Sequence, residues 1–214
     1  ENELSARFGI RNPIVLTSFE GDRESNAIEG LTNYAALYIS DKLKGDCVFG
    51  ITGSHNVTGT VHMLRKQHDC NLKVVQTIGA SINQDMSADL VNFLANTFDG
   101  NAYFLNTPVY VDDLAVKEKL LKDPAVAEAM LLMKKCDLIL MSIGNFDVNG
   151  DMPNWWGYMT EQHRIELESH GAAGSMCAQF FDFDGNWIEC DWNRKCVSIP
   201  WEYLRAAGER IVIA

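Results

Sequence analysis

The stretch DCVFGITGSHNV, residues 46–57, carries the clearest structural signal in this chain. Its first half, residues 46–51, is a short apolar run of the length expected for a buried strand. Its second half is a loop of small and polar residues, after which residues 57–66 have the apolar spacing of a helix. A buried strand followed by a loop and a helix is the repeating unit of a parallel α/β sheet.

The same alternation of strand and helix repeats on both sides of this stretch. Further strands are expected at 13–19, 72–76, 102–105 and 137–143, and further helices at 25–44, 86–98, 113–121 and 124–135. Nearly continuous apolar strands separated by helices are typical of a parallel sheet covered on both faces. Residues 1–145 therefore predict a Rossmann-like, doubly wound α/β fold with a mostly parallel sheet.

The last third of the chain has a different pattern. Helices are expected at 160–169 and 200–207, short β segments at 178–183, 187–190 and 196–199, a turn at 184–186, and a core strand at 211–214. The turn residues indicate a small β-hairpin added near the C-terminus. Because no Pro- or Ser-rich linker divides the chain, residues 1–214 are expected to form one domain.

Composition excludes several classes of protein. The 214 residues carry a formal charge of −11, and a chain this acidic is a poor partner for nucleic acid, whose phosphates require clustered Lys and Arg. No apolar run is long enough to cross a membrane, and residues 1–10 lack the basic and apolar regions of a secretory signal. We therefore expect a cytoplasmic protein with no membrane partner.

The cysteines indicate neither a disulfide framework nor a metal site. No C-x-x-C pair occurs, and the histidines lack zinc-ligand spacing to the cysteines or to one another. We expect six buried, reduced thiols of a cytosolic protein, with no metal and no cofactor. They are Cys47, Cys70, Cys136, Cys177, Cys190 and Cys196.

The loop at residues 52–56 is the strongest candidate for ligand binding. In α/β sheets, ligands bind where strands end and helices begin, and the free N–H groups of a helix start favour an anion, above all a phosphate. Thr52 and Ser54 add hydroxyl groups, and His55 is interpreted as a base, a phosphate donor or neither. A plain turn capped by Ser54 or Asn56 explains the same residues, so both interpretations stay open.

Two longer loops add candidate residues. In the loop at residues 78–85, Gly79 permits a close backbone approach, and Gln84 and Asp85 can bond hydroxyl groups, although such a loop alone is most often simply solvated. In the loop at residues 142–156, Gly144 and Asp147 follow the most apolar strand. The pair Trp155–Trp156 in that loop either meets a ligand or partner or folds onto the domain's own surface.

Two further groups of residues are more ambiguous. The segment at 171–175 offers Gly171 as a helix C-cap, while Gly174 and Ser175 allow tight packing or ligand approach. Four carboxylates flank the expected hairpin turn, and we interpret them as solvated turn residues rather than as a catalytic pair. They are Asp182, Asp184, Glu189 and Asp191.

Five segments, taken in order, carry a resemblance to a known family. They are ELSARFGIRNPIVL (3–16), CVFGITGSHNV (47–57), VVQTIGAS (74–81), CDLILMSIGNFD (136–147) and GAAGSMCAQFFDFDG (171–185). Together they resemble the effector-binding domain of the SorC family of bacterial sugar-operon regulators. The last is the most specific of the five. The resemblance implies the Rossmann-like fold of the sugar-phosphate isomerase and CoA-transferase group, and a phosphorylated sugar as ligand.

The resemblance also assigns roles to the candidate residues. It implies that the phosphate binds at Gly53, Ser54, His55 and Asn56, where many members have Gly-Thr-Thr or Gly-Arg-Thr. The candidate sugar-contacting residues are Thr52, Gly79, Gln84, Asp85, Gly144, Asp147 and Ser175. Ile78 replaces the first glycine of a Gly-Gly turn, which argues for a monophosphate, and Ser175 replaces an Asp or Glu that bonds sugar hydroxyls.

The resemblance implies partners beyond the sugar phosphate. Family members carry an N-terminal helix-turn-helix and continue past the IVIA strand with a Gly-Gly loop, a ligand-contacting Lys and a final helix. We therefore expect this chain to be a fragment of a regulator that touches DNA only through another domain, and that assembles as a dimer or tetramer. Effector binding would shift the arrangement of the subunits and so alter DNA binding.

A sugar-phosphate isomerase or related enzyme of the same fold is the alternative. It would need a general base near the sugar, for which Asp85 and Asp147 are the candidates. No acid–base pair stands out, and Ser175 occupies the position that usually holds a carboxylate. The sequence therefore favours a regulator domain without catalytic residues.

Overall fold

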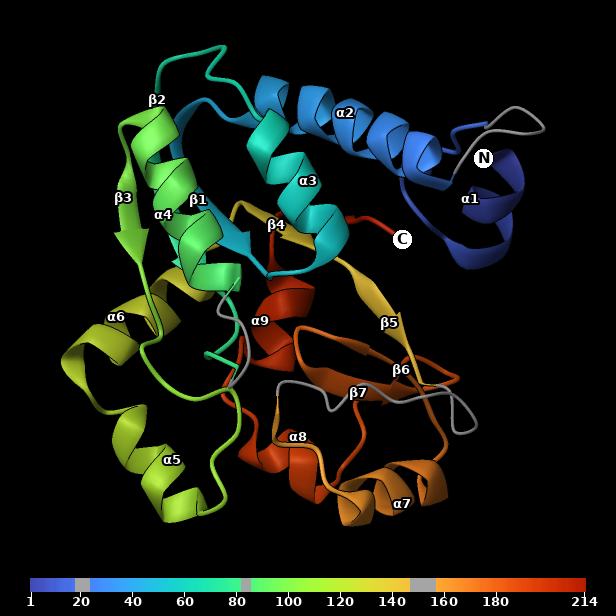
Figure 1. The fold of residues 1–214 in the computed structure, drawn as a ribbon, viewed down its shortest axis with the longest axis vertical. Helices are drawn as coiled ribbons and strands as arrows, with labels where there is room; N and C mark the ends of the chain where they lie inside the picture. The colour runs from blue at the N-terminus through green and yellow to red at the C-terminus, as the bar shows by residue number, and fades with distance from the viewer. Residues whose placement is uncertain (18–23, 82–85, 147–156) are drawn as a thin grey trace.

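A computed structural model describes residues 1–17, 24–81, 86–146 and 157–214 (Figure 1). Its main sheet is parallel, with strand order β3-β2-β1-β4-β8, and a second sheet is antiparallel, with order β5-β6-β7. The strands are β1 Gly45–Ile51, β2 Cys70–Gln76, β3 Asn101–Tyr103, β4 Leu138–Met141, β5 Ile143–Asn145, β6 Ala172–Met176, β7 Gln179–Asp182 and β8 Glu209–Val212. The expected α/β fold with a mostly parallel sheet is confirmed.

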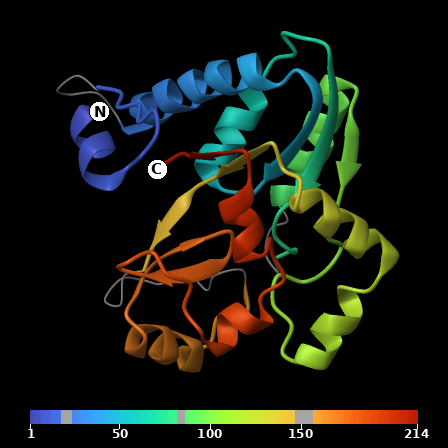
Figure 2. The ribbon, with the colours of Figure 1, turned by 180° about the vertical axis from the view of Figure 1, so that it is seen from behind.

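The helices of the described residues are α1 Asn2–Phe8, α2 Glu24–Lys42, α3 His55–Met63, α4 Met86–Phe98, α5 Leu114–Leu120, α6 Pro124–Met133, α7 Glu161–Ser169, α8 Asp191–Lys195 and α9 Trp201–Ala206. Of these, α2, α3 and α4 cover one face of the parallel sheet, and α6 and α9 cover the other. In the two views of Figures 1 and 2, the antiparallel sheet, α7 and α8 lie at the opposite end of the molecule from α2. Within the described residues, no helix is long and apolar enough to cross a membrane.

The core consists of two apolar clusters separated by the parallel sheet. On one face, Phe49 and Val74 pack with the buried residues of α2, α3 and α4. On the other face, Val75 and Ile139 pack with residues of α6, α9 and the antiparallel sheet. Successive side chains of a strand point to opposite faces of the sheet, so each of these strands contributes apolar side chains to both clusters. The parallel sheet is therefore buried on both faces.

The expected strand at 13–19 is wrong for its described part. Residues 13–17 form no strand, and Val15 and Leu16 are 53% and 40% exposed. The backbone N–H of Val15 donates to the Glu1 carboxylate at 3.1 Å rather than to a neighbouring strand. Residues 18 and 19 lie outside the described part of the chain. An apolar run without a strand partner does not become a strand.

The expected strand at 137–143 is divided between the two sheets. β4 Leu138–Met141 joins the parallel sheet, and β5 Ile143–Asn145 pairs with β6 in the antiparallel sheet. Ser142 stands between them, so the chain passes from one sheet to the other within a single residue. The apolar pattern alone did not reveal this change of sheet.

Three other expectations for the last third are corrected. β6 Ala172–Met176 is a strand where a loop was expected, and the segments at 187–190 and 196–199 form only isolated bridges, such as Tyr110 with Cys196. Between them the short helix α8 begins after Cys190, which caps it. β8 Glu209–Val212 pairs with β4, with Val212 45% exposed, so it is an edge strand of the described sheet.

Candidate functional site

The carboxyl ends of β1 and β2 are joined by two buried threonines. The hydroxyl of Thr77 donates to the carbonyl of Ile51 at 2.8 Å, and its Oγ1 lies 2.6 Å from Oγ1 of Thr52. Because the Thr77 proton is already directed to Ile51, Thr52 donates to Thr77. The backbone N–H of Thr52 donates to Leu140 O at 3.1 Å, so β1, β2 and β4 end at one connected edge.

The tip of the β6–β7 hairpin reaches this edge. Sγ of Cys177 lies 3.3 Å from Oγ1 of Thr52, and the oxygen of Thr52 is free to accept the thiol proton. Burial raises the pKa of Cys177 to about 11, against hydrogen bonds to Thr52 and Thr77 that lower it. Cys177 therefore stays a thiol at neutral pH and ties the antiparallel sheet to the end of β1.

The same tip has an unusual backbone. Cys177 and Ala178 form the two-residue turn between Met176 and Gln179, with φ values of 49° and 62°. Turns of this kind normally use Asn-Gly or similar residues, because a side chain at positive φ is strained. The carbonyl of Ala178 accepts from Nε1 of Trp192 at 2.8 Å, and this contact helps to hold the turn.

The start of α3 is a capped helix N-terminus. Oγ of Ser54 accepts from the backbone N–H of Val57 at 3.2 Å, which confirms the expected Ser54 cap. The first helical bond runs from Thr58 to Ser54, so the N–H groups of His55 and Asn56 precede it and donate to no acceptor in the described part of the chain. His55 is exposed and Asn56 half-buried. Both interpretations of this loop are compatible with that geometry, and the phosphate site stays a prediction.

Gly53 already has a partner that was not anticipated. Its backbone N–H donates to Oγ of Ser87 at 2.8 Å, and Ser87 lies in the first turn of α4. This bond brings the N-termini of α3 and α4 together at the carboxyl edge of the sheet. Neither Ser87 nor Thr77 stands out in the sequence, because each is a single hydroxyl without a motif.

Position 79 requires a glycine for a structural reason that does not depend on a ligand. A Cβ atom at this position would lie 2.5 Å from the carbonyl oxygen of Pro108 and 2.7 Å from the nitrogen of Val109. The close backbone approach that glycine permits here is therefore made by residues 108–109 of the chain itself. The N–H of Gly79 donates to Val197 O at 2.9 Å.

Gly144 and Ser175 lie opposite each other in the antiparallel sheet. They are paired residues of β5 and β6, and Ser175 is 5% exposed. A Cβ at Gly174 would lie 2.6 Å from the carbonyl oxygen of Gly144, which explains the small residue there by tight packing. Gly171 has φ 68° just after α7, as expected for a helix end.

The remaining candidates lie outside the described residues. They are Gln84, Asp85 and Asp147 of the expected site, together with Trp155 and Trp156. The structure thus brings Thr52 to the strand edge with Thr77 and Cys177, beside Gly53 and Ser54.

Asp182, one of the four hairpin carboxylates, has the role expected of a turn residue. It accepts backbone N–H bonds from Asp184 at 2.9 Å and Asn186 at 2.8 Å. The backbone hydrogen bonds, led by that of Asn186, hold its pKa below the ordinary value. Asp184 and Glu189 are exposed. These three carboxylates lie in or beside a turn, as expected.

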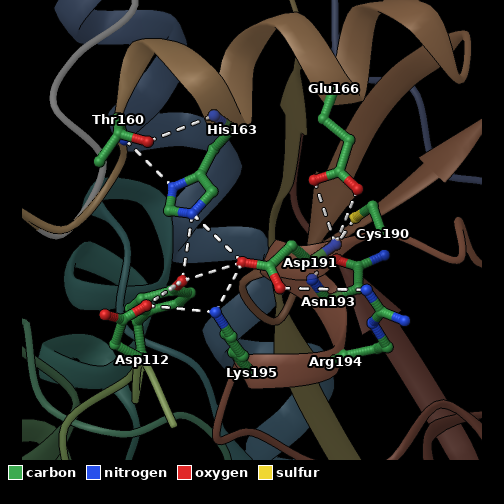
Figure 3. A network of polar contacts seen from close by, with 10 residues as sticks. Asp112, Thr160, His163, Glu166, Cys190, Asp191, Asn193, Arg194 and Lys195 are labelled. Carbon is green, nitrogen blue, oxygen red and sulfur yellow. Dashed lines mark hydrogen bonds and ion pairs between the residues drawn. The ribbon is translucent and has the colours of Figure 1, made fainter.

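Asp191 does not fit the expectation of a solvated turn residue, because it belongs to a polar network (Figure 3). Its carboxylate lies 2.9 Å from Nζ of Lys195 and accepts from the Tyr110 hydroxyl at 3.3 Å. Partial burial raises its pKa, but the hydrogen bond and charge of Lys195, with smaller effects from Tyr110 and His163, hold it below the ordinary value. Asp191 is a structural residue at the start of α8.

The network continues through the buried His163 on α7. Its Nδ1 accepts the backbone N–H of Thr160 at 3.2 Å, so in the neutral ring the proton is on Nε2. Nε2 lies 3.1 Å from the Tyr110 hydroxyl and 3.7 Å from Asp191. Figure 3 shows how these side chains join α7, α8 and the loop that carries Asp112. The arrangement fixes the ends of two helices.

The expectation of six buried thiols holds for five of them and is wrong for Cys70, which is half-buried. All six cysteines are free, and five of them are buried. Burial raises the pKa of Cys47, Cys136 and Cys196 to about 12 in each case. Within the described residues, no three His, Cys, Asp or Glu side chains gather as a metal site would require.

The fold and this edge together define a class of protein. A parallel α/β sheet that ends in a helix N-terminus, buried hydroxyls and a second small sheet is a Rossmann-like domain of the ligand-binding type. A family model described as "Putative sugar-binding domain" matches residues 1–214. The chain belongs to this sugar-binding domain family, which occurs in transcriptional regulators of sugar operons.

Individual relatives agree with this assignment. The sorbitol operon regulator of Klebsiella pneumoniae is 22% identical, covering 100% of this chain and 69% of that protein. The deoxyribonucleoside regulator of Bacillus subtilis is also 22% identical, covering 99% and 67%. These relatives are named as regulators, and the resemblance to the SorC family is confirmed.

Solved structures show the same fold. The full-length sorbitol operon regulator SorC of Klebsiella pneumoniae superimposes with a TM-score of 0.89 at 20% identity, covering 100% of this chain and 69% of that one. A transcriptional regulator from Streptococcus pneumoniae gives a TM-score of 0.91 at 17% identity, covering 99% and 82%.

Proposed function

We propose that this domain binds a phosphorylated sugar at the carboxyl edge of its parallel sheet and thereby controls DNA binding by a regulator. The phosphate binds at the start of α3, on Gly53, Ser54, His55 and Asn56. The observation that carries this proposal is the pair of N–H groups of His55 and Asn56, which have no acceptor in the described part of the chain. Such groups at a helix start favour an anion.

The sugar lies between this helix start and the antiparallel sheet. Thr52 is held in place by hydrogen bonds to Thr77 and Cys177, and Ser175 lies on β6, the strand that directly precedes Cys177. Gly79, Gln84, Asp85, Gly144 and Asp147 complete the proposed sugar contacts. The rigid, hydrogen-bonded edge favours a preformed site, in which little ordering opposes binding.

The domain acts as a binding module without catalysis. Its relatives are named as regulators, and Ser175 supplies no carboxylate for acid–base chemistry. The protein acts in the cytoplasm. DNA is contacted through another domain, because this chain is acidic, with a formal charge of −11, and nucleic-acid binding requires clustered Lys and Arg. The alignment with the sorbitol operon regulator likewise covers 69% of that protein. Subunits associate as a dimer or tetramer, for which exposed apolar residues of α2, such as Leu37 at 65%, offer a surface.

Calorimetric titration tests the phosphate site most directly. Sugar monophosphates are injected beside the same sugars without phosphate, and one phosphorylated sugar is expected to give saturable heat. Ser54→Glu places a carboxylate at the helix start, where it repels the phosphate, and binding is expected to fall at least about a hundredfold. The same affinity for Ser54→Glu and the unmodified protein would remove the phosphate from this loop.

A matched variant separates local repulsion from added charge. Gln67→Glu adds one negative charge at an exposed position beyond the opposite end of α3 and should leave affinity unchanged. Circular dichroism melting of both variants verifies the fold. Steady heat from continued turnover of a sugar phosphate would contradict a purely binding role.

A further inference from the structure

A second pocket, of about 850 Å³, lies between α5, α6, α8, α9 and the segment at 196–200. Among the described residues that line it, none belongs to the proposed sugar-phosphate site. The pocket is within the size range of small-molecule sites. It therefore needs its own explanation.

The walls of the pocket are largely apolar and held in place. Leu121, Met130 and Val197 supply aliphatic and thioether surface. Nε1 of Trp187 donates to Oε1 of Gln179 at 2.9 Å, which fixes that indole ring. Trp201 lies beside Phe181, with ring centroids 6.3 Å apart. Two positioned indoles beside aliphatic side chains form a preformed surface for a flat apolar group.

One polar group in this pocket is poorly compensated. Lys117 is half-buried, and its ammonium donates to the backbone carbonyl of Arg194 at 2.6 Å. No carboxylate of the described residues lies within ion-pair distance of it. Burial lowers the pKa of Lys117, which is the response of an ammonium that lacks a counter-ion. An anion in the pocket would supply that missing charge.

Among the described residues that line the pocket, every charged side chain except one is a cation. Arg194 and Arg205 line it with Lys117, and Glu202 is the acidic residue among its described lining. Among the described residues, the ion pairs of Arg194 are distant, 3.7 Å to Glu189 and 3.9 Å to Asp191. In a chain with a formal charge of −11, this local excess of cations favours an anionic ligand.

We propose that this pocket binds a small carboxylate with an aromatic or apolar body. The carboxylate pairs with Nζ of Lys117, and the body packs against Trp187 and Trp201. An apolar cavity with a few convergent polar groups is the usual form of such a site. This proposal is independent of the sugar-phosphate site, because it uses different residues and a different ligand.

A pair of matched probes tests the proposal by calorimetry. The probes are 4-phenylbutyrate and 4-phenylbutan-1-ol, which share one body and differ in charge. The carboxylate is expected to bind saturably with a dissociation constant of about 1 mM or tighter, and the alcohol at least about tenfold more weakly. Equal affinity for both probes, or no saturable binding of the carboxylate, overturns the proposal.

Variants then locate the binding. Lys117→Met keeps most of the side-chain length but removes the charge, and should weaken the carboxylate about tenfold while the alcohol is unaffected. Lys119→Met removes the same charge from an exposed position on α5 and should change nothing. An unchanged affinity of Lys117→Met, or an equal loss in Lys119→Met, contradicts the proposed contact.

A second variant tests the apolar part of the pocket without changing Lys117. Trp201→Ala keeps the lysine and removes one apolar wall, so it should weaken both probes about equally. Melting by circular dichroism verifies that each variant is folded. If Trp201→Ala binds both probes as the unmodified protein does, the ligand lies elsewhere and the proposal is overturned.

Discussion

The two sheets of this domain are stabilised in different ways. In the parallel sheet, β1 and β2 bury apolar side chains such as Phe49 and Val74 between helices. In the antiparallel sheet, Phe180 is also buried in an apolar cluster, and in addition the side chain of Asn193 on α8 bonds to the strand backbone. Asn193 alone contacts the N–H and the carbonyl of Phe180. The first sheet is specified by its own residues, and the second depends on residues that follow it in the chain.

The largest expected effect tests the parallel sheet. Phe49→Ala removes a fully buried side chain from β1 and leaves a cavity, so it should lower the free energy of unfolding by about 4 kcal/mol. Phe183→Ala, at a position that is 87% exposed, is the matched control and should cost less than about 0.5 kcal/mol. Denaturant unfolding measures both values. Similar losses in the two variants would contradict the importance of this core.

The next effect tests the antiparallel sheet. Asn193→Leu removes three buried hydrogen bonds, to the N–H and the carbonyl of Phe180 and to the carbonyl of Ile188, and should cost about 3 kcal/mol. The exposed Asn92 provides a control, since Asn92→Leu should change stability by less than about 0.5 kcal/mol.

Hydrogen exchange in Asn193→Leu sharpens the comparison. Amides of β6 and β7 should exchange faster than in the unmodified protein, while those of β1 and β2 keep their protection. An equal loss of protection in both sheets would mean that they unfold as one unit, and the contrast between them would fail.

The smallest expected effect is a change in the free energy of unfolding whose sign, rather than size, tests the strain in the turn at Cys177 and Ala178. Ala178→Gly relieves a side chain at φ 62° but loses a buried methyl group, so we expect a net stabilisation of roughly 0.5 kcal/mol. Ala173→Gly, in the neighbouring strand β6, should instead destabilise by roughly 0.5–1 kcal/mol. Thermal melting compares the two, and destabilisation by both would show that the turn is not strained.

The contrast also explains which elements could be predicted. The helix at 86–98 agrees with α4 to the residue, and the strands at 46–51 and 72–76 lie within β1 and β2. Their apolar patterns are determined by burial in their own segments. β6 was missed because AAGSM has neither a strong apolar run nor alternation, and its pairing is provided by β5 and β7.

The site was predictable to a similar, limited degree. The Ser54 cap follows from local chemistry, because the capping side chain and the N–H it accepts are three residues apart. The contact between Thr52 and Cys177 joins residues that are 125 positions apart, and no spacing rule indicates it. The bond from Gly53 to Ser87 is hidden for the same reason. Long-range contacts between single hydroxyls and thiols become visible only in the folded chain.

The packing of Gly79 against residues 108–109 has a practical consequence for altering ligand preference. Any side chain at this position collides with the Pro108 backbone before a ligand is considered. A substitution there that abolishes binding therefore reports damage to the scaffold and carries no information about specificity. Efforts to redesign the preference of this domain should vary Ser54 and His55, whose half-buried and exposed side chains leave more room for change, and keep Gly79 constant.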